Sequence, residues 1–245
     1  MGDDGFVVYD EFGGAALDDT RWQVTPLPLP DGGSHLPWDP HARVVVGGGE
    51  ARITIPAFSL ADDKHQAADS VKFLALSTRE FEISAERPAT FAADFAVDTS
   101  NGEPADYRTG IACLQVADLA GTHRVFSVCG TSTRVLAMHE HLAPDPSGEP
   151  FIHVAESPYE DFGDDFTRFR ACAVTLDRAA GWVTWRVDDR TIYHAYEPHL
   201  PERARIGLGI FTMLPIRDGR SRSLRGQGMG ARYRRPRTLG VPEPH

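Results

Sequence analysis

The 245-residue chain has few cysteines, only two lysines and no long apolar run. No stretch approaches the roughly 18 apolar residues that a bilayer-spanning helix needs, so the sequence predicts no membrane segment. The N-terminus is acidic and lacks the basic and apolar regions of a secretory signal. Cys113, Cys129 and Cys172 are widely spaced, form no Cys-x-x-Cys motif, and each lies in an apolar run. We therefore expect three buried free thiols, distant from one another, in a cytoplasmic protein.

Net positive charge is also missing, since the formal charge is −10 at pH 7. The segment from Arg217 to Arg237 is basic, with eight arginines and one acid, and basic tails can bind nucleic acid. The rest of the chain is strongly acidic and would repel phosphate groups. We expect this segment to fold back onto the acidic body, with no nucleic-acid partner.

An alternation of strands with helices, which a parallel α/β fold requires, is not found in the sequence. What the chain has is many turn-forming residues, with 23 glycines and 18 prolines, between short runs of alternating apolar residues. These features predict one all-β domain over residues 1–245, a two-sheet antiparallel sandwich of about thirteen strands with little helix. The predicted strands are Arg43–Val46, Ala51–Ile55, Val71–Ser77, Phe81–Ile83, Thr90–Asp98, Gly110–Val116, His123–Cys129, Val135–His141, Phe151–Ala155, Phe169–Leu176, Trp182–Val187, Thr191–Tyr196 and Arg205–Met213.

Three stretches rich in proline, glycine or acidic residues predict loops at residues 24–42, 144–150 and 157–166. The first is long enough to have a functional role, and it carries Trp38 as its large apolar anchor. We expect it to cover an apolar pocket on the concave face of a sheet, together with the turn Gly226–Gly228. Trp38 and Tyr107 are predicted to contribute to the walls of this pocket.

The region Phe169–Tyr196 resembles the paired strands of concanavalin-A-like jelly rolls. The likeness lies in Val174–Arg178 followed by Val183–Arg190, where a strand containing Trp185 runs into an Asp-Asp turn. The chain as a whole resembles an uncharacterised actinobacterial family with this sandwich, whose members accompany secondary-metabolite pathways. The points of likeness are Asp69–Phe73, Leu76–Thr78, His139–Leu142, Val187–Asp188, Leu208–Ile210 and Arg225–Gly228. This resemblance implies a cyclase role and supplies no catalytic residues.

The laminarinase-like branch of this fold hydrolyses glycans with a strand that carries Glu-x-Asp-x-Glu, and the sequence has no such strand. The nearest candidate is Met138–His141, which contains one carboxylate, Glu140. Alternation puts His139 and His141 on one face of this strand and Glu140 on the other. His-x-His can ligate a metal, as in cupins, but the glycine and glutamate of the cupin pattern are not at the expected spacings. We predict no metal and no cofactor. One interpretation is that both histidines are plain surface residues; the other gives an acid/base role to either Glu140 or His139, with His141 in substrate binding.

Two further polar residues are candidates for the same pocket. Lys72 stands out because lysine is scarce, and a Schiff base or proton relay is one interpretation. The alternative is an ion pair on the outer face of a sheet. Gln227, between Gly226 and Gly228, has an amide that could bind a substrate carbonyl, whereas a plain turn before a last strand at Met229–Tyr233 is the other interpretation.

The main functional hypothesis from the sequence is a cofactor-free cyclase or lyase acting on a small apolar, polyketide-like metabolite. Such an enzyme works by holding a flexible chain in a reactive conformation, with one or two acid/base groups, and leaves no visible motif. The alternatives are a non-catalytic module that binds carbohydrate or another metabolite, and a glycan-active enzyme with diverged carboxylates. The lining of the concave face is expected to distinguish these functions. The oligomeric state stays open.

Overall fold

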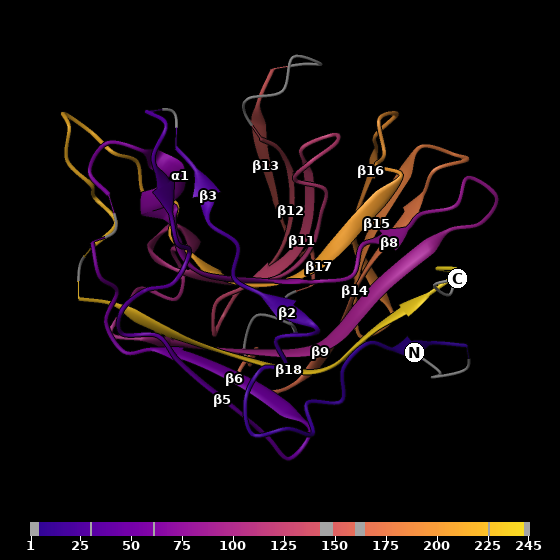
Figure 1. Ribbon diagram of the computed structural model, residues 1–245, viewed down its shortest axis with the longest axis horizontal. Helices are drawn as coiled ribbons and strands as arrows, with labels where there is room; N and C mark the ends of the chain where they lie inside the picture. The colour runs from indigo at the N-terminus through magenta and orange to yellow at the C-terminus, as the bar shows by residue number, and fades with distance from the viewer. Residues whose placement is uncertain are drawn as a thin grey trace.

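Two large antiparallel sheets stacked on each other make up the fold (Figure 1). The computed structural model describes residues 5–29, 31–60, 62–142, 149–159, 165–224 and 226–242. The first sheet, sheet A, has the strand order β16-β15-β14-β9-β18-β6-β5, with β1 pairing with β18. Its strands are β16 (Arg190–Tyr196), β15 (Trp182–Val187), β14 (Arg170–Asp177), β9 (Ala89–Ser100), β18 (Gly228–Leu239), β6 (Glu50–Ile55), β5 (Arg43–Gly47) and β1 (Val7–Val8).

The second sheet, sheet B, has the strand order β13-β12-β11-β10-β17-β7-β2, with β8 pairing with β17. Its strands are β13 (Phe151–Glu156), β12 (Val135–His141), β11 (Arg124–Gly130), β10 (Ile111–Ala117), β17 (Arg203–Phe211), β7 (Val71–Ser77), β2 (Trp22–Gln23) and β8 (Phe81–Glu82). A hairpin of β3 (Leu27–Pro28) and β4 (Ser34–His35) stands apart from both sheets. Helix within the described ranges is limited to α1 (Gln66–Ser70) and the 3-10 turn η1 (Tyr107–Thr109).

The predicted fold class is confirmed, because each of the predicted strand runs overlaps one strand of the two sheets. The last strand is longer than predicted: β18 extends to Leu239, with a register shift between Arg234 and Arg237. Pro236 lies at this shift. Proline has no backbone N–H to donate to a neighbouring strand, and at the shift the regular hydrogen-bond ladder is already interrupted. The 24–42 loop is ordered in its described part and holds the small β3-β4 hairpin. Of the other two predicted loops, residues 144–148 of the first and 160–164 of the second lie outside the described residues.

The main hydrophobic core lies between the two sheets. Alternate residues of each strand point into it, as Ala112, Leu114 and Val116 of β10 do. Its largest members are aromatic: Tyr233 stacks on Phe95 with ring centroids 4.9 Å apart, and other rings come from Phe91, Phe126 and Trp185. Burying many large apolar side chains between facing sheets is what stabilises a sandwich.

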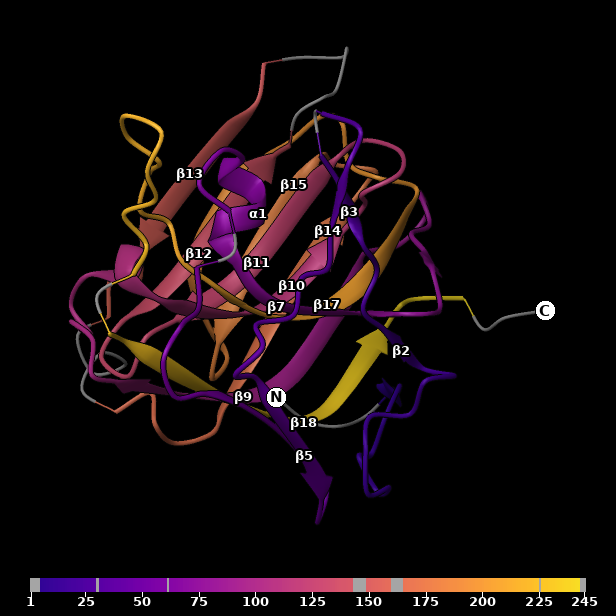
Figure 2. The ribbon, with the colours of Figure 1, turned by 60° about the vertical axis from the view of Figure 1, so that its left-hand side comes forward.

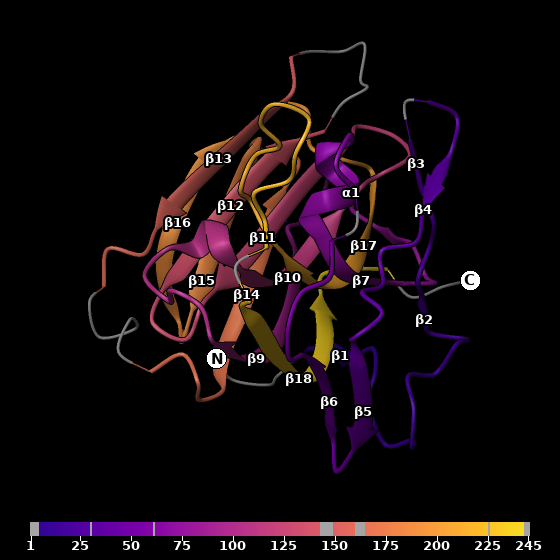
Figure 3. The same cartoon turned by 90° about the vertical axis from the view of Figure 1, so that its left-hand side faces the viewer.

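Sheet B is curved, and its concave face points away from sheet A (Figure 1). The helix α1 and the β3-β4 hairpin lie on this side of sheet B in all three views (Figure 2, Figure 3). The segment after β17, residues 212–224, runs beside α1, and the backbone N–H of Ile216 donates to the Gln66 side chain at 2.7 Å. These segments cover part of the concave face. None of the described helices is long and apolar enough to cross a membrane.

Candidate functional site

The concave face of sheet B is lined by the alternate residues that do not enter the main core. Most of them are apolar and fully buried, and they form a second cluster, the concave cluster: Ile111, Cys113, Cys129, Leu136 and Met138. Tyr107 of η1 and Met213 of the segment after β17 pack on this cluster from above. Leu27 of β3 packs in the same way on Leu74 and Leu76 of β7. The covering segments therefore anchor on the concave face through apolar side chains.

Three polar side chains, one each on β10, β11 and β12, interrupt this apolar surface, and the strand register brings two of them together. Ser127 of β11 is directly opposite Gln115 of β10. Gln115 in turn is opposite Gly207 of β17, where a side chain would come within about 3.1 Å of Gln115. The glycine thus leaves space for the Gln115 amide to lie across the neighbouring strand.

The third polar side chain, Glu140 of β12, projects from the concave face beside this pair. It shares its face with Met138, and Met138 is directly opposite Ser127. Burial raises the pKa of the Glu140 carboxyl to about 7. No other described residue hydrogen-bonds or pairs with Glu140, and the buried Ser127 hydroxyl likewise has no partner among the described residues. Buried polar groups without partners are uncommon in proteins and often mark a place where a ligand binds.

His139 and His141 lie on the opposite side of β12 from Glu140, as alternation predicted. His139 is buried between the sheets: its Nε2 is 3.2 Å from the Glu197 carboxylate, and its ring packs on Phe126 with centroids 5.0 Å apart. The same carboxylate is 3.2 Å from Nε of Arg124. The ring nitrogen Nδ1 of His141 is 2.9 Å from the Glu149 carbonyl oxygen. Neither histidine shares the concave face with Glu140, so only Glu140 enters our proposal as an acid/base group.

Lys72 is held in a buried polar network rather than on an open face. Its Nζ is 3.6 Å from the Asp69 carboxylate and donates to the Ser59 carbonyl at 3.1 Å. Asp69 also accepts hydrogen bonds from the hydroxyls of Ser221 and Ser223. Desolvation lowers the pKa of Lys72, with the Asp69 carboxylate acting in the opposite direction. The network ties α1 to the segment after β17. The sequence favoured an ion pair for Lys72 over a proton relay, and an ion pair is present, but it is buried and does not lie on an open outer face.

The remaining predicted site residues are Gln227, Trp38 and Tyr107, and they do not lie together. Gln227 is 2% exposed, and its amide nitrogen donates to the carbonyl oxygens of Thr109 and Ser223, so it belongs with the Lys72 network. Trp38 packs on Phe73 with ring centroids 5.1 Å apart and is 36% exposed. Of the predicted wall residues, Tyr107 is the one that contacts the concave cluster. Sequence reasoning missed Ser127 and Gln115, because neither lies in a motif.

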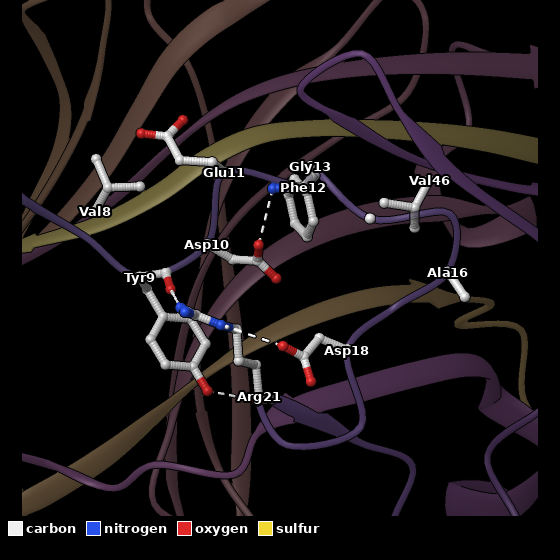
Figure 4. Close-up of a pocket in the computed structure, with 11 residues that line it drawn as sticks. Val8, Tyr9, Asp10, Glu11, Phe12, Gly13, Ala16, Asp18, Arg21 and Val46 are labelled. Carbon is white, nitrogen blue, oxygen red and sulfur yellow. Dashed lines mark hydrogen bonds and ion pairs between the residues drawn. The ribbon is translucent and has the colours of Figure 1, made fainter.

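A pocket of about 570 Å³ lies away from the concave face, along the N-terminal segment (Figure 4). Its walls are residues 8–14, Ala16, Asp18, Arg21 and Val46. Several of its polar side chains are already engaged: Asp10 accepts hydrogen bonds from the backbone N–H of Phe12 and from the Trp22 indole. Arg21 in the same way forms an ion pair with Asp18. These internal partners make the pocket a part of the folded N-terminal segment.

Comparison with known proteins places the chain in a family. Residues 9–238 match the pattern of a family described as "Family of unknown function (DUF6081)". The chain belongs to this family. No curated protein matches it. The family match agrees with the predicted membership of an uncharacterised family, whereas nothing found here supports a link to actinobacterial secondary metabolism.

Solved structures with the same arrangement include several glucanases. An endo-1,3-beta-glucanase from Streptomyces sioyaensis has a TM-score of 0.60, is 12% identical, and is matched over 98% of each chain. LamA from Zobellia galactanivorans has a TM-score of 0.58 at 12% identity, with 96% of this chain and 98% of that one covered. A beta-1,3-1,4-glucanase (lichenase) derived from a mouse hindgut metagenome has a TM-score of 0.58 at 13% identity, with 94% and 97% covered. At such identities the likeness shows the fold.

The cyclase function favoured by the sequence is therefore wrong. Its basis was a faint resemblance to a secondary-metabolite family, and the structures that share this fold over nearly their whole length are glycan-degrading enzymes. The finding favours the glycan-active alternative. The prediction of a small apolar ligand has not been tested.

Proposed function

We propose that this chain is a diverged glycan-active enzyme that binds a β-glucan along the concave face of sheet B and uses Glu140 as a general acid. The fold likeness supports a glycan, because the similar structures include a LamA variant in complex with laminaritriose and laminaritetraose. The observation that carries the proposal is Glu140 itself. It is a carboxyl group on the concave face, without a protein partner among the described residues and with a pKa of about 7.

Such a carboxyl group suits proton donation to a glycosidic oxygen. A general acid works best when its pKa lies near the working pH, because a large fraction is then protonated while proton transfer stays favourable. Glu140 meets this condition through burial beside Met138 and the rest of the concave cluster. The Ser127 hydroxyl and the Gln115 amide, in the neighbouring strands, are available to hydrogen-bond sugar hydroxyls.

The arrangement departs from the usual pair of carboxylates. A retaining glycosidase needs two carboxyl groups about 5 Å apart, and an inverting one needs them roughly 6.5–9.5 Å apart. The other described acids on this face of the sheet B strands are Glu82 of β8, which lies four strands away from β12, and Glu156 of β13, four residues beyond the partner of Glu140, Ile152. Four residues of strand correspond to about 13 Å. Water must therefore attack without help from Glu156, and we expect slow turnover.

A second candidate function is glycan binding without catalysis. The missing second carboxylate favours it, and the Ser127 and Gln115 side chains would serve it equally well. The two functions differ only in the role of Glu140, so a variant at this residue distinguishes catalysis from binding alone.

The test measures binding and turnover separately. Affinity electrophoresis in gels containing a β-1,3-glucan or a β-1,3-1,4-glucan reports binding, and reducing-end release from the same polymers reports hydrolysis. Glu140→Gln should lower turnover by about 10²-fold or more while binding persists. Glu156→Gln, which makes the same change in a carboxyl already paired with Arg134, is the matched control and should leave turnover near the parent rate.

Each outcome assigns the function. Turnover that falls as pH rises through about 7, and that Glu140→Gln removes, supports the general acid. Retarded migration with no turnover by the parent protein assigns the chain to the binding function. Absence of both on each polymer would refute a β-glucan as the ligand.

A further inference from the structure

Two of the three cysteines meet on the concave face. Cys113 of β10 and Cys129 of β11 are directly opposite in the strand register, and their sulfur atoms are 2.7 Å apart. The expectation from the sequence that the thiols are mutually distant is therefore wrong for this pair. Cys172 lies on β14 in sheet A, opposite Val187. All three are buried and free in this structure.

The backbone at this place already has the geometry of a cross-strand disulfide. Six consecutive residue pairs join β10 to β11, from Ala112–Gly130 to Ala117–Val125, without a register shift. Directly opposite residues in such a ladder have Cα atoms about 4.5–5.5 Å apart, within the roughly 4.4–6.8 Å that disulfides span. Both side chains also point to the same face, where they contact each other inside the concave cluster. A bond between them needs no movement of the strands.

We propose that Cys113 and Cys129 are a redox site that forms an intramolecular disulfide by exchange with a small-molecule disulfide. One cysteine thiolate attacks the small disulfide, forms a mixed disulfide and releases one small thiol. The second cysteine then attacks the protein sulfur of that mixed disulfide and releases the other small thiol. The pair loses two electrons, the small disulfide gains them, and the two protons of the protein thiols end on the released thiols.

Burial determines when this exchange takes place. Both cysteines are 0% exposed. Burial also raises the pKa of the Cys113 thiol, and the thiolate is the reactive form. The reaction in the folded protein is therefore slow, and it is fast while the chain folds, before the concave face is covered. The redox conditions at folding decide which form is made, so the cysteine content gives no reason to place the protein in a reducing compartment.

The disulfide would fasten two central strands of sheet B. It links residues 113 and 129 across a short loop, and closing such a loop restricts the unfolded chain. For a chain of this size we expect the oxidised form to melt roughly 5–10 °C above the reduced form. This inference does not rest on the proposed glycan function, because it concerns sulfur chemistry and stability alone.

The experiment refolds the full chain from the reduced, unfolded state in a buffer of oxidised and reduced glutathione. Thiols are then counted with a maleimide reagent under denaturing, non-reducing conditions, and the mass of the intact chain is measured. The parent should keep one reactive thiol and lose about 2 Da. Cys172→Ser should keep none and still migrate as a monomer on a non-reducing gel. The double variant Cys113→Ser with Cys129→Ser should keep its single thiol and show no redox-dependent change in melting temperature.

Two results would overturn the proposal. One is three reactive thiols in the parent after refolding and after prolonged incubation with oxidised glutathione in a low concentration of urea. The other is a disulfide that involves Cys172, seen as loss of redox sensitivity in Cys172→Ser. Neither result depends on whether the protein binds a glucan.

Discussion

The polar network around Lys72 and the polar residues of the concave face differ in how their polar groups are paired. In the network, Asp69 is 0% exposed, accepts hydrogen bonds from two serine hydroxyls and pairs with a lysine. On the concave face, Ser127 is fully buried and Glu140 is partly buried, and neither has a hydrogen-bond or ion-pair partner among the described residues. Buried polar groups that partner one another stabilise a fold, whereas buried polar groups without partners lower its stability. The network therefore serves the structure, and the concave face keeps groups that a ligand can satisfy.

The two regions also treat ionisation differently. Lys72 and Asp69 lie as an ion pair, so each compensates the other for the loss of water. Glu140 has no such compensation, and its pKa rises until the carboxyl is neutral in a large part of the molecules at neutral pH. The contrast can be tested by removing one member of each region.

The largest effect is expected from Lys72→Met. This change keeps an unbranched side chain that is one atom shorter and removes its charge, which leaves the buried Asp69 carboxylate without its cation. Breaking one side of a buried ion pair typically costs about 3–5 kcal/mol of unfolding free energy. Urea denaturation followed by circular dichroism measures it. Lys64→Met, at the only other lysine, is the control, since Lys64 is exposed and should change stability by less than about 0.5 kcal/mol. Similar values for both variants would mean that the network contributes little.

The next effect concerns Glu140 and depends on pH. Its pKa of about 7 in the folded protein lies above its ordinary value of 4.5, so the folded state keeps a proton that the unfolded chain has lost. Stability from this group is complete below about pH 4.5 and decreases as pH rises to about 7. Glu140→Gln removes this dependence. The variant should match the parent at pH 4.5 and exceed it at pH 8 by as much as about 3 kcal/mol.

The control for this pH dependence is Glu156→Gln on the neighbouring strand. That carboxyl is exposed and paired with Arg134, so its replacement should give a stability difference with little pH dependence. Parallel stability curves for Glu140→Gln and the parent from pH 4.5 to 8 would show that the carboxyl of Glu140 is not desolvated, and would remove the main support for its role as an acid.

How far the sequence predicts these regions depends on the strand pattern. Period-two alternation correctly placed His139 and Glu140 on opposite faces of β12. It could not tell which face is concave, because sheet B is covered on both sides and its central strands β10 and β11 are buried at every position. Lys72 stood out by its rarity, but its role depends on Asp69, Ser221 and Ser223, which only the folded chain brings together. The pairing of Cys113 with Cys129 follows from a register that no local pattern fixes.

The smallest expected effect on stability compares a serine hydroxyl that has a hydrogen-bond partner with one that has none. The Ser127 hydroxyl is buried on the concave face without a hydrogen-bond partner among the described residues. Ser127→Ala removes a desolvated polar atom and leaves almost the same volume, so we expect it to raise the unfolding free energy by about 1 kcal/mol. Ser223→Ala is the matched change in the network, where the hydroxyl donates to Asp69 at 3.1 Å. It should lower stability by about 1–2 kcal/mol.

The changes in unfolding free energy of these two alanine variants are measured by urea denaturation in the same buffer. Opposite signs would establish the contrast for two single hydroxyl groups. The same proteins sharpen the functional proposal, because Ser127→Ala should weaken migration retardation in a β-glucan gel while Ser223→Ala leaves it unchanged. A loss of stability in Ser127→Ala as large as that in Ser223→Ala would mean that the Ser127 hydroxyl has a partner in solution, such as an ordered water. In that case the concave face would be a satisfied part of the core, with no hydroxyl held ready for a ligand.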